Sequence, residues 1–252
     1  MIRTYVLDTG ILPDMQDDPA GWEACLKKLP AERVEKIRRI RHAEAKKQSL
    51  GAGLLLHEVC SRLAPEAEIT SGAYGKPVCT ELSFNLSHTK EAVILSVWEG
   101  GNDSARVLTG CDIEKLHPYR SGIAGRFFTR AEYDSLEAVR DPQAQAELFC
   151  RYWTRKESVM KLTGLGLSLP MDLYDVRGSQ PVADRTKVSA WYENALQKGE
   201  HRTELAQAVK ILLQEELYWK EYRYRDCCIT VCSTCNCFAP DYVLAKPQIK
   251  GI

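Results

Sequence analysis

The run from Val107 to Glu114 constrains the fold more than any other part of the sequence. It alternates between two kinds of residue, and a period of two is typical of a β-strand with one buried face. The residues expected on the buried face are Val107, Thr109, Cys111 and Ile113. Asp112 and Glu114 share the other face, where two carboxylates repel each other unless a cation lies between them. Oxygen ligands suit a hard cation such as magnesium, although two ordinary surface acids at a strand end would give the same pattern.

A second pattern, from Gln143 to Gly164, has the period of an α-helix. Its apolar stripe consists of Ala146, Cys150, Trp153 and Met160. Glu157 falls inside this stripe, and Lys161 follows one turn later. A carboxylate on the core side of a helix is costly unless it is paired or binds a metal. Two interpretations stay open: a Glu157–Lys161 pair at the edge of the core, or three carboxylates, two of them from the strand, around one cation that polarises phosphate oxygens.

The composition excludes few classes of protein. The 252 residues allow one large domain or two small ones. Lys and Arg number 34, as do Asp and Glu, so nothing calls for nucleic acid or an anionic membrane as partner. Residues 1–9 alternate like a strand rather than an export signal, and no apolar run approaches the roughly 18 residues of a membrane helix. With ten cysteines, this predicts reduced thiols in a cytoplasm.

Half of the cysteines stand near the C-terminus: Cys227, Cys228, Cys232, Cys235 and Cys237. The Cys-x-x-Cys spacing from Cys232 to Cys235 suits zinc. Structural zinc needs four converging ligands, however, and the nearest histidine, His201, is far upstream. Residues 226–233 also have the composition of a buried strand, in which cysteine serves as a small apolar side chain. The buried strand is the favoured interpretation.

The segment from Leu26 to Lys47 is the most basic of the chain. Its cationic residues are Lys27, Lys28, Arg33, Lys36, Arg38, Arg39, Arg41, Lys46 and Lys47. Pro30 followed by Glu32 is typical of a helix start, and a second helix is predicted over residues 49–63. Such charges usually form a solvated helix face, but they could also bind a phosphorylated ligand or an acidic partner.

Three possible phosphate donors follow. A loop predicted over residues 71–77 contains Lys76, and Ser87 and His88 precede a strand predicted over 91–98. Together these side chains form a plausible donor set for a phosphate. A surface lysine and a structural histidine would give the same sequence, and a Ser-His pair without a third partner is weak evidence for hydrolysis. Residues 100–104 predict a turn between two halves.

The remaining elements are assigned from periodicity and capping signals. The predicted segments are helices at 122–128 and 129–139, strands at 173–177 and 209–225, and a helix or strand at 203–214. Thr129 and Glu132 have the spacing of a capping box. The last dozen residues have the pattern of a tail.

Four short motifs follow one another in a fixed order along the chain: Tyr74-Gly75-Lys76-Pro77, Asn85-Leu86-Ser87-His88, Gly110-Cys111-Asp112-Ile113-Glu114, and Trp153-Thr154-Arg155-Lys156-Glu157-Ser158 with Lys161. In this order and at these spacings the chain resembles the 4'-phosphopantetheinyl transferases of the Sfp type, over about residues 30–233. The late Cys-Ile-Thr-Val-Cys strand also has a counterpart in that family. Four ordered motifs are far more specific than any one of them.

The resemblance implies a fold and a division into halves. The expected fold is α+β: a pseudo-two-fold monomer of two similar halves, each with an antiparallel sheet packed on a long helix. Residues 1–103 would carry the basic helix and the contacts to the nucleotide of coenzyme A. Residues 104–252 would carry the metal-binding acids and the catalytic helix. The site would lie in the cleft between the halves.

The resemblance also implies a reaction, the transfer of the 4'-phosphopantetheine arm of coenzyme A to a serine of an apo acyl or peptidyl carrier protein, with release of adenosine 3',5'-bisphosphate. Asp112, Glu114 and Glu157 would hold Mg²⁺, or Mn²⁺, against the pyrophosphate. Glu157 would take the serine proton, and Lys161 would neutralise pyrophosphate charge. The residues implied to contact coenzyme A are Arg33, Lys36, Lys47, Lys76, Ser87, His88, Asp112, Lys156 and Lys161.

Three features depart from the family pattern. Cys111 replaces an aliphatic residue, Lys47 stands where arginine is expected, and residues 178–217 form a longer segment than expected, with an open role. Two other functions stay open: a non-catalytic relative that binds coenzyme A or a carrier, and a metal-dependent phosphohydrolase. The intact acidic trio argues against the first, and the lack of a second His and Asp cluster in the sequence argues against the other. The sequence does not distinguish fatty-acid, polyketide and nonribosomal-peptide carriers.

Overall fold

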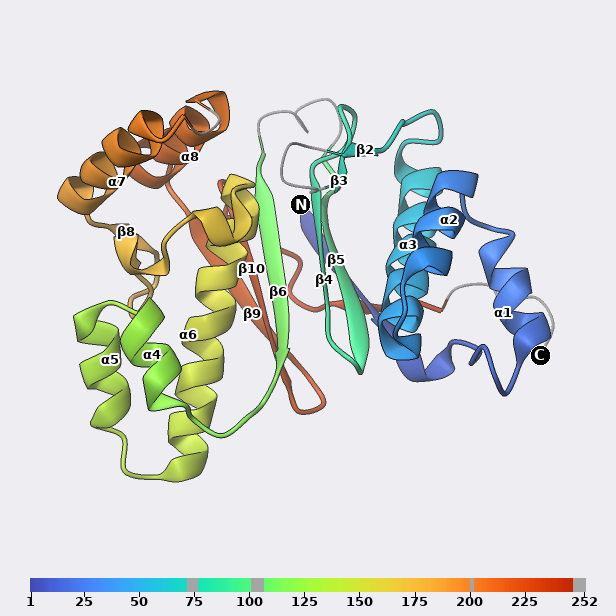
Figure 1. Cartoon of the computed structure of the whole chain (residues 1–252), viewed down its shortest axis with the longest axis horizontal. Helices are drawn as coiled ribbons and strands as arrows, with labels where there is room; N and C mark the ends of the chain where they lie inside the picture. Colours follow the sequence, from blue (N-terminus) through green and yellow to red (C-terminus); the bar gives the residue numbers. More distant parts are fainter. Residues whose placement is uncertain (72–76, 101–106, 200–201, 247–252) are drawn as a thin grey trace.

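The computed structural model describes residues 1–71, 77–100, 107–199 and 202–246 (Figure 1). Two sheets lie next to each other in the centre of the molecule, and one long helix covers the outer face of each. Across Figure 1 from right to left, the order is helix α3, the first sheet, the second sheet and helix α6.

The first sheet contains β1 (Ile2–Asp8), β4 (Phe84–His88), β5 (Ala92–Trp98) and β11 (Val243–Leu244), in the order β11-β1-β5-β4. Strands β1, β5 and β4 are antiparallel, and β11 runs parallel to β1. Alternation along β1 sends Tyr5 and Leu7 into the core under α3 (Ala43–Leu63). Ile2 and Val6 face the second sheet instead.

The second sheet contains β6 (Thr109–Lys115), β10 (Cys227–Ser233) and β9 (Tyr218–Tyr224), in the order β6-β10-β9, with antiparallel pairing throughout. Helix α6 (Pro142–Thr163) packs on its outer face. The Asp141 side chain caps this helix, and Gly164 ends it with a φ of 82°, a left-handed conformation that suits glycine. The strand and the helix predicted to carry the acids are therefore confirmed, each within two residues at both ends.

An apolar cluster joins the inner faces of the two sheets. Its members include Ile2, Val6 and Ile94 from the first sheet and Cys111, Ile113, Ile229 and Val231 from the second. Burial of such side chains contributes roughly 25 cal/mol per Å² of apolar surface. The Cys111 amide also donates a hydrogen bond to Asn85 Oδ1 at 2.9 Å. The cluster and this bond fix β4, with Ser87 and His88, beside β6, with Asp112 and Glu114.

Gly110 allows the helix α6 to approach the strand β6 closely. A Cβ atom at this position would lie 2.1 Å from the Ser158 carbonyl oxygen and 2.4 Å from the Leu162 amide nitrogen. The helix backbone therefore occupies the space that any other side chain would need. This close contact brings the acidic face of β6 against the helix that carries Glu157.

The basic segment, residues 26–47, extends into two helices, and the second of them starts earlier than predicted. Helix α2 (Ala31–Arg39) starts after Pro30 as expected, but α3 begins at Ala43, six residues before the predicted start. The first residues of α3 are mostly polar and hold no apolar period, so the sequence pattern marks the helix only from about residue 49. The smaller elements of this half are η1 (Thr9–Ile11), α1 (Pro19–Leu26), β2 (Thr70–Ser71) and β3 (Pro77–Val78).

Helices surround the outer side of the second sheet. The helices α4 (Ser121–Phe127) and α5 (Arg130–Glu137) confirm two predictions, and the predicted capping box is present. The long segment of open role contains α7 (Arg185–Gln197) and α8 (Arg202–Gln214), which pack on each other. The extended pattern predicted from residue 209 is wrong as far as Gln214, because Leu205, Ala208, Ile211 and Leu212 form one buried helical stripe. The short elements are η3 (Gly166–Ser168), η4 (Met171–Leu173), β7 (Tyr174–Asp175) and β8 (Val182–Ala183).

The chain returns to the first sheet near its end. Ile2 N donates to Cys237 O at 2.6 Å, and Ala245 N donates to Val6 O at 2.8 Å, on either side of the point where β11 starts beside β1. The expectation of a tail was wrong for residues 241–246, the described part of that segment. A two-residue edge strand gives no period that a sequence pattern could reveal.

The cysteine-rich strand is buried, as favoured. All seven residues of β10 are buried, and Cys227 and Cys232 have no exposed surface. Cys235 lies just beyond the strand and is half-buried. Among the residues described, no three His, Cys, Asp or Glu side chains are arranged to hold a metal ion, so no zinc ligand set forms around the Cys-x-x-Cys pair.

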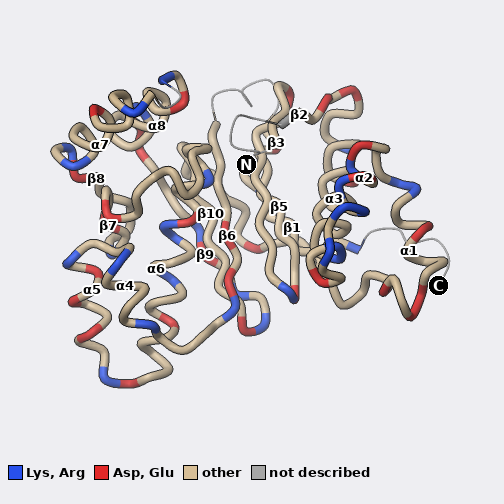
Figure 2. Tube along the Cα trace, in the orientation of Figure 1, with Lys and Arg blue, Asp and Glu red and all other residues tan. Residues whose placement is uncertain are grey.

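The architecture is α+β with mainly antiparallel sheets, as predicted. The similarity of the two halves and the division at residue 103 stay predictions. Basic and acidic residues are interspersed along the trace (Figure 2), in keeping with the balanced composition. In the described part of the chain, no helix combines the length and the apolar character needed to cross a membrane.

Candidate active site at the junction of the two sheets

Asp112, Lys161 and Ser87 meet where the two sheets adjoin. They come from β6, from the last turn of α6 and from β4. Lys161 Nζ donates to Asp112 Oδ1 at 2.6 Å and to Ser87 Oγ at 2.8 Å, and Ser87 Oγ donates to Asp112 Oδ1 at 2.9 Å. Asp112 is only 2% exposed, and charges interact more strongly away from water. One carboxylate therefore ties three elements together.

The second oxygen of Asp112 is not satisfied in the same way. Asp112 Oδ2 is buried and accepts no hydrogen bond from the residues described. A buried carboxylate oxygen without a donor costs free energy. This oxygen is therefore suited to a cation or to a donor brought by a ligand.

Two more carboxylates act electrostatically on this cluster. Burial first, and then the charge of Asp112, raise the pKa of Glu114 to about 7, with a smaller contribution from Glu157 in the same direction. A hydrogen bond from Trp153 to Glu114 opposes that rise. Burial and Asp112 also raise the pKa of Glu157. Raised pKa values of neighbouring carboxyl groups indicate a site with more negative than positive charge.

The residues fit a hard divalent cation by their chemistry. The ligands on offer are carboxylate oxygens, which Mg²⁺ prefers, and both the unsatisfied Asp112 Oδ2 and the two raised pKa values mark a place where positive charge would be stabilising. The side chains are not already gathered as a closed ligand set within the described residues. Sharing of one cation by all three acids therefore stays a proposal.

A cavity of about 720 Å³ lies between α2, α3 and β4. Arg33 and Lys36 line it, together with Leu86, the neighbour of Ser87. Arg33 Nη2 donates to Ser49 O at 2.8 Å, whereas its Nε is buried and has no acceptor among the described residues. Burial lowers the pKa of Arg33. A half-buried guanidinium with an unused donor is suited to an anionic ligand.

His88 lies within electrostatic reach of both the cavity and the Asp112 cluster. Its side chain is exposed at the end of β4. Partial desolvation and then the charge of Lys161 lower the pKa of His88, and Arg33 contributes in the same direction. Because Lys161 and Arg33 both act on one imidazole, an anion that contacts His88 would be attracted from both sides.

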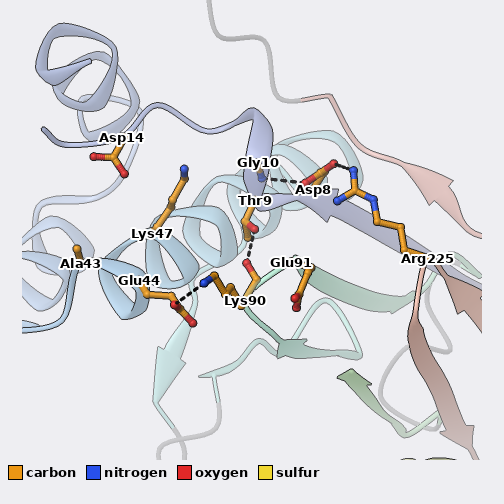
Figure 3. A pocket seen from close by; sticks show the side chains of 10 residues that line it. All are labelled: Asp8, Thr9, Gly10, Asp14, Ala43, Glu44, Lys47, Lys90, Glu91 and Arg225. Carbon is orange, nitrogen blue, oxygen red and sulfur yellow. Dashed lines mark hydrogen bonds and ion pairs between the residues drawn. The ribbon is translucent and has the colours of Figure 1, made fainter. Parts of the chain in front are cut away.

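Lys47 lies in a different cavity, of about 410 Å³ (Figure 3). Asp14 and Glu44 line the same cavity. Lys90 Nζ lies 3.6 Å from Glu44 Oε2 there, and Arg225 pairs with Asp8 at the far side. The structure thus does not bring Lys47 into one cavity with Arg33 and Lys36. Lys76 lies outside the described residues.

Lys156 points away from the candidate site. It has no exposed surface, its Nζ lies 2.8 Å from Glu132 Oε2, and it donates to the carbonyl oxygens of Met171 and Tyr174 at 2.7 and 2.6 Å. Successive residues of a helix point about 100° apart, so Lys156 enters the core while Glu157 faces the acids of β6. This arrangement gives Lys156 no contact with a ligand in the cleft, in contrast to the expectation.

The sequence patterns missed three residues that support the site. Glu132 was assigned only as a capping residue, but its carboxylate also accepts a bond from Val176 N at 2.7 Å and pairs with Lys156. Trp153 was assigned to the core stripe, and it also donates to Glu114. Asn85 joins β4 to β6. Only Glu132 left a signal, since a lysine at a core position of a helix requires an acidic partner.

Comparison with known proteins agrees with this geometry. Residues 109–218 match the family model of the 4'-phosphopantetheinyl transferase superfamily. The matched stretch includes β6, α6 and all three acids of the candidate site. Residues 109–218 are therefore similar to the members of that superfamily.

Named relatives extend the match. A 4'-phosphopantetheinyl transferase of Bacillus subtilis is 37% identical over 157 residues, and the transferase Sfp of Bacillus subtilis strain 168 is 36% identical over 156 residues. Each alignment covers 59% of this chain and 66% of the relative. The transferase AcpT of Escherichia coli K12 is 36% identical over 119 residues, covering 45% of this chain and 55% of AcpT. The resemblance to the Sfp type is confirmed over these spans.

Proposed function

We propose that this protein transfers the 4'-phosphopantetheine arm of coenzyme A to a serine of an apo acyl or peptidyl carrier protein, with Mg²⁺ or Mn²⁺, and releases adenosine 3',5'-bisphosphate. The observation that carries the proposal is the Asp112–Lys161–Ser87 cluster, in which Asp112 is buried and has one unsatisfied carboxylate oxygen; Asp112 and Lys161 lie inside the family match. The relatives named above are transferases of this class.

The nucleotide end of coenzyme A is assigned to the cavity that Arg33 and Lys36 line. That end of the molecule carries a 3'-phosphate and a pyrophosphate, and the cavity offers the unused Arg33 Nε and an exposed lysine. His88 would then contact phosphate oxygens between the cavity and Lys161. Phosphates are bound well by such charge-assisted donors. Lys47 and Lys156 have no part in this assignment.

At the cluster, Lys161 would neutralise charge on the pyrophosphate. Although burial opposes it, Asp112 raises the pKa of Lys161, so its ammonium stays charged at neutral pH. Asp112, Glu114 and Glu157 would hold the divalent cation, which supplies Lewis-acid polarisation of the phosphate oxygens. Glu157 is the candidate to accept the proton of the carrier serine, since a raised pKa makes a carboxylate a better base.

The proposal includes a monomeric enzyme in the cytoplasm. Its site would lie between an N-terminal half (1–103) and a C-terminal half (104–252). The pairing of Ser87 with Asp112 and Lys161 supports this, because each half supplies part of the cluster. Two similar halves related by a pseudo-two-fold axis are part of the same proposal.

The test is to incubate the protein with coenzyme A, Mg²⁺ and apo carrier proteins from fatty-acid, polyketide and nonribosomal-peptide systems, and to weigh each carrier by mass spectrometry. We expect at least one carrier to gain one phosphopantetheine group, and the gain to disappear with EDTA. No gain on any carrier, together with tight binding of coenzyme A, would favour the non-catalytic relative. Release of phosphate without a carrier would favour a phosphohydrolase.

Glu157→Gln provides the matched variant for this test. The amide keeps the size of the side chain but cannot accept the serine proton, and general-base catalysis contributes about 10²- to 10⁴-fold. We expect a loss of that order in the transfer rate, with an unchanged circular dichroism spectrum and melting temperature. Full activity of the variant would remove Glu157 from the mechanism.

A further inference from the structure

We propose that Cys150 and Cys228 form a redox modification site, in which a small disulfide oxidises the two thiols to an intramolecular disulfide. The new bond lowers the metal affinity and the activity of the neighbouring acidic site. Formation of the bond is independent of the proposed function, whereas its effect on transfer rests on that function.

The two thiols belong to different elements and face each other. Cys150 is on α6 and Cys228 is on β10, and both lie against Glu114: Cys228 pairs with it in register, and Cys150 Sγ donates to its carbonyl oxygen at 3.6 Å. They are 4% and 6% exposed. Two cysteines can be bridged only if their side chains converge, and these two converge on the Glu114 backbone.

The pair is attached to both elements that carry the acids. Cys228 is paired in register with Glu114 across β10 and β6. Cys150 Sγ donates to the Glu114 carbonyl oxygen at 3.6 Å. On α6, Cys150 stands seven residues before Glu157, which is two turns away on the same helix face. A covalent bond here therefore acts on the backbone beside Glu114 and on the helix that positions Glu157.

A small oxidant has a route to Cys150. This residue lines a cavity of about 170 Å³ together with Trp153, His117 and Arg120, and His117 and Arg120 are exposed at the surface. By contrast, Cys227 and Cys232 of the same sheet have no exposed surface and do not line this cavity. Access through the cavity distinguishes Cys150 from the cysteines that only fill the core.

The chemistry is ordinary thiol–disulfide exchange. One thiol of the pair loses its proton, and its sulfur attacks one sulfur of the small disulfide, whose S–S bond breaks and releases one thiolate. The second thiol of the pair then loses its proton, and its sulfur attacks the protein sulfur of the mixed disulfide and releases the second small thiolate. Each released thiolate takes up one of the two protons. The protein loses two electrons, and the small disulfide is reduced by the same two electrons to two thiols.

The bond changes the spacing of α6 and β10. Two bonded sulfurs lie only about 2.05 Å apart, closer than any two unbonded thiols, so the helix and the strand must shift toward each other at this point. Misplacement of a catalytic group by about 1 Å costs up to roughly 100-fold in rate. We therefore expect oxidation to lower transfer by about 10- to 100-fold.

The test is to treat the reduced protein with 2-hydroxyethyl disulfide and to map its disulfides by peptide mass spectrometry. Mn²⁺ affinity and the transfer rate are measured in the reduced protein, in the oxidised protein, and again after reduction with dithiothreitol. We expect a peptide that joins Cys150 to Cys228, weaker Mn²⁺ binding, slower transfer, and recovery of both on reduction. Cys150→Ser and Cys228→Ser should each retain affinity and activity under oxidant. Cys237→Ser, which removes an exposed thiol, should respond like the wild type.

Two results would overturn the inference: the absence of a Cys150–Cys228 peptide in the wild type, or its presence with unchanged Mn²⁺ affinity. If one serine variant fails to fold, the other decides the matter. If the reduced wild type binds Mn²⁺ but transfers nothing, the proposed function fails, and the disulfide map and Mn²⁺ affinity still decide the redox site.

Discussion

Asp112 uses its two oxygen atoms differently, and this difference defines the site. Oδ1 takes hydrogen bonds from Lys161 and Ser87, whereas Oδ2 has no donor among the residues described. The first oxygen holds three elements together, and the second is left for a ligand. A single buried carboxylate thus connects the stability of the junction to the chemistry proposed for it.

The raised pKa of Glu114 predicts a pH-dependent metal affinity. Burial and Asp112 raise this pKa to about 7, and a carboxyl must lose its proton before it can bind a cation. Below pH 7 the proton competes with the metal, so we expect Mn²⁺ affinity to fall by about tenfold for each pH unit. Isothermal titration in buffers of different ionisation enthalpy would measure both affinity and proton release.

Glu114→Gln is the control for this pH dependence. Since the amide does not gain or lose a proton near neutral pH, the variant should bind Mn²⁺ more weakly at pH 8 but with a flatter pH profile. Mn²⁺ affinity of the wild type that does not change between about pH 6 and 8 would contradict the assignment of Glu114 as a ligand.

Lys156 and Glu132 form a buried pair whose loss should be costly. Both side chains have no exposed surface, and Lys156→Met would leave Glu132 buried without its cation. We expect the free energy of unfolding to fall by about 3–5 kcal/mol, as measured by urea denaturation. The double variant with Glu132→Gln should recover part of this loss, and Lys198→Met on the exposed surface should change little. A cost below about 1 kcal/mol for Lys156→Met would show that the pair is not needed.

Sequence patterns predicted which residues could form the site but not all of their partners. The shared face of Asp112 and Glu114 follows from the strand period, and the position of Glu157 follows from the helix period. The contact between Lys161 and Asp112, 49 residues apart, depends on how α6 lies across β6. The roles of Lys47 and Lys156 were taken from motif position alone, which does not reveal the direction of a side chain.

At the scale of elements, the contact between β6 and α6 decides where the acids lie. Long elements with a clear period, such as α6, were predicted almost to the residue. The start of α3 and the strand β11 were not, because polar helix turns and two-residue edge strands carry no period. The packing of β4 against β6, which belong to different sheets, is also a tertiary contact, and no local sequence pattern predicts it.

Gly110→Ala should disrupt the contact between β6 and α6. The added methyl carbon would collide with the backbone of Ser158 and Leu162, and backbone cannot move aside as a side chain can. We expect a loss of at least about 2 kcal/mol in the free energy of unfolding and a lower transfer rate, because Glu157 moves with the helix.

Gly122→Ala is a matched control in α4, where a new Cβ would meet nothing within 4 Å. Alanine favours a helix over glycine by up to about 1 kcal/mol, so this variant should be at least as stable as the wild type in the same urea denaturation. Equal stability of Gly110→Ala and the wild type would contradict the proposed close approach.

At the scale of the whole molecule, the two sheets are joined by an apolar cluster and by ion pairs at its edge. Lys115 Nζ, at the end of β6, lies 2.6 Å from Glu91 Oε1, in the turn between β4 and β5. This pair connects the turn of the first sheet to the second. It lies at the surface, so its contribution is small beside that of the buried cluster.

Glu91→Gln should reduce stability only where the carboxylate is charged. The hydrogen bond from Lys115 holds the pKa of Glu91 below its usual value of 4.5. Its contribution is therefore present above that value and is lost as the pH falls through the lower pKa of the folded state. We expect the wild type to be slightly more stable than the variant at pH 7 and equal to it near pH 2, by urea denaturation at each pH. A difference that grows toward low pH would be the wrong sign, and Glu193→Gln on α7 is the control.

The return of the chain to β1 has a consequence for anything attached at its C-terminus. Strand β11 shields the outer border of β1, whose amide and carbonyl groups would otherwise offer a template to a neighbouring copy. Removing residues 237–246, or pulling them away with a fused partner, would unmask that border and favour self-association. An affinity tag at the N-terminus would lie beside the same sheet, because Ile2 is hydrogen-bonded to Cys237 and Ala239. A label at Glu193, exposed on α7, would avoid both.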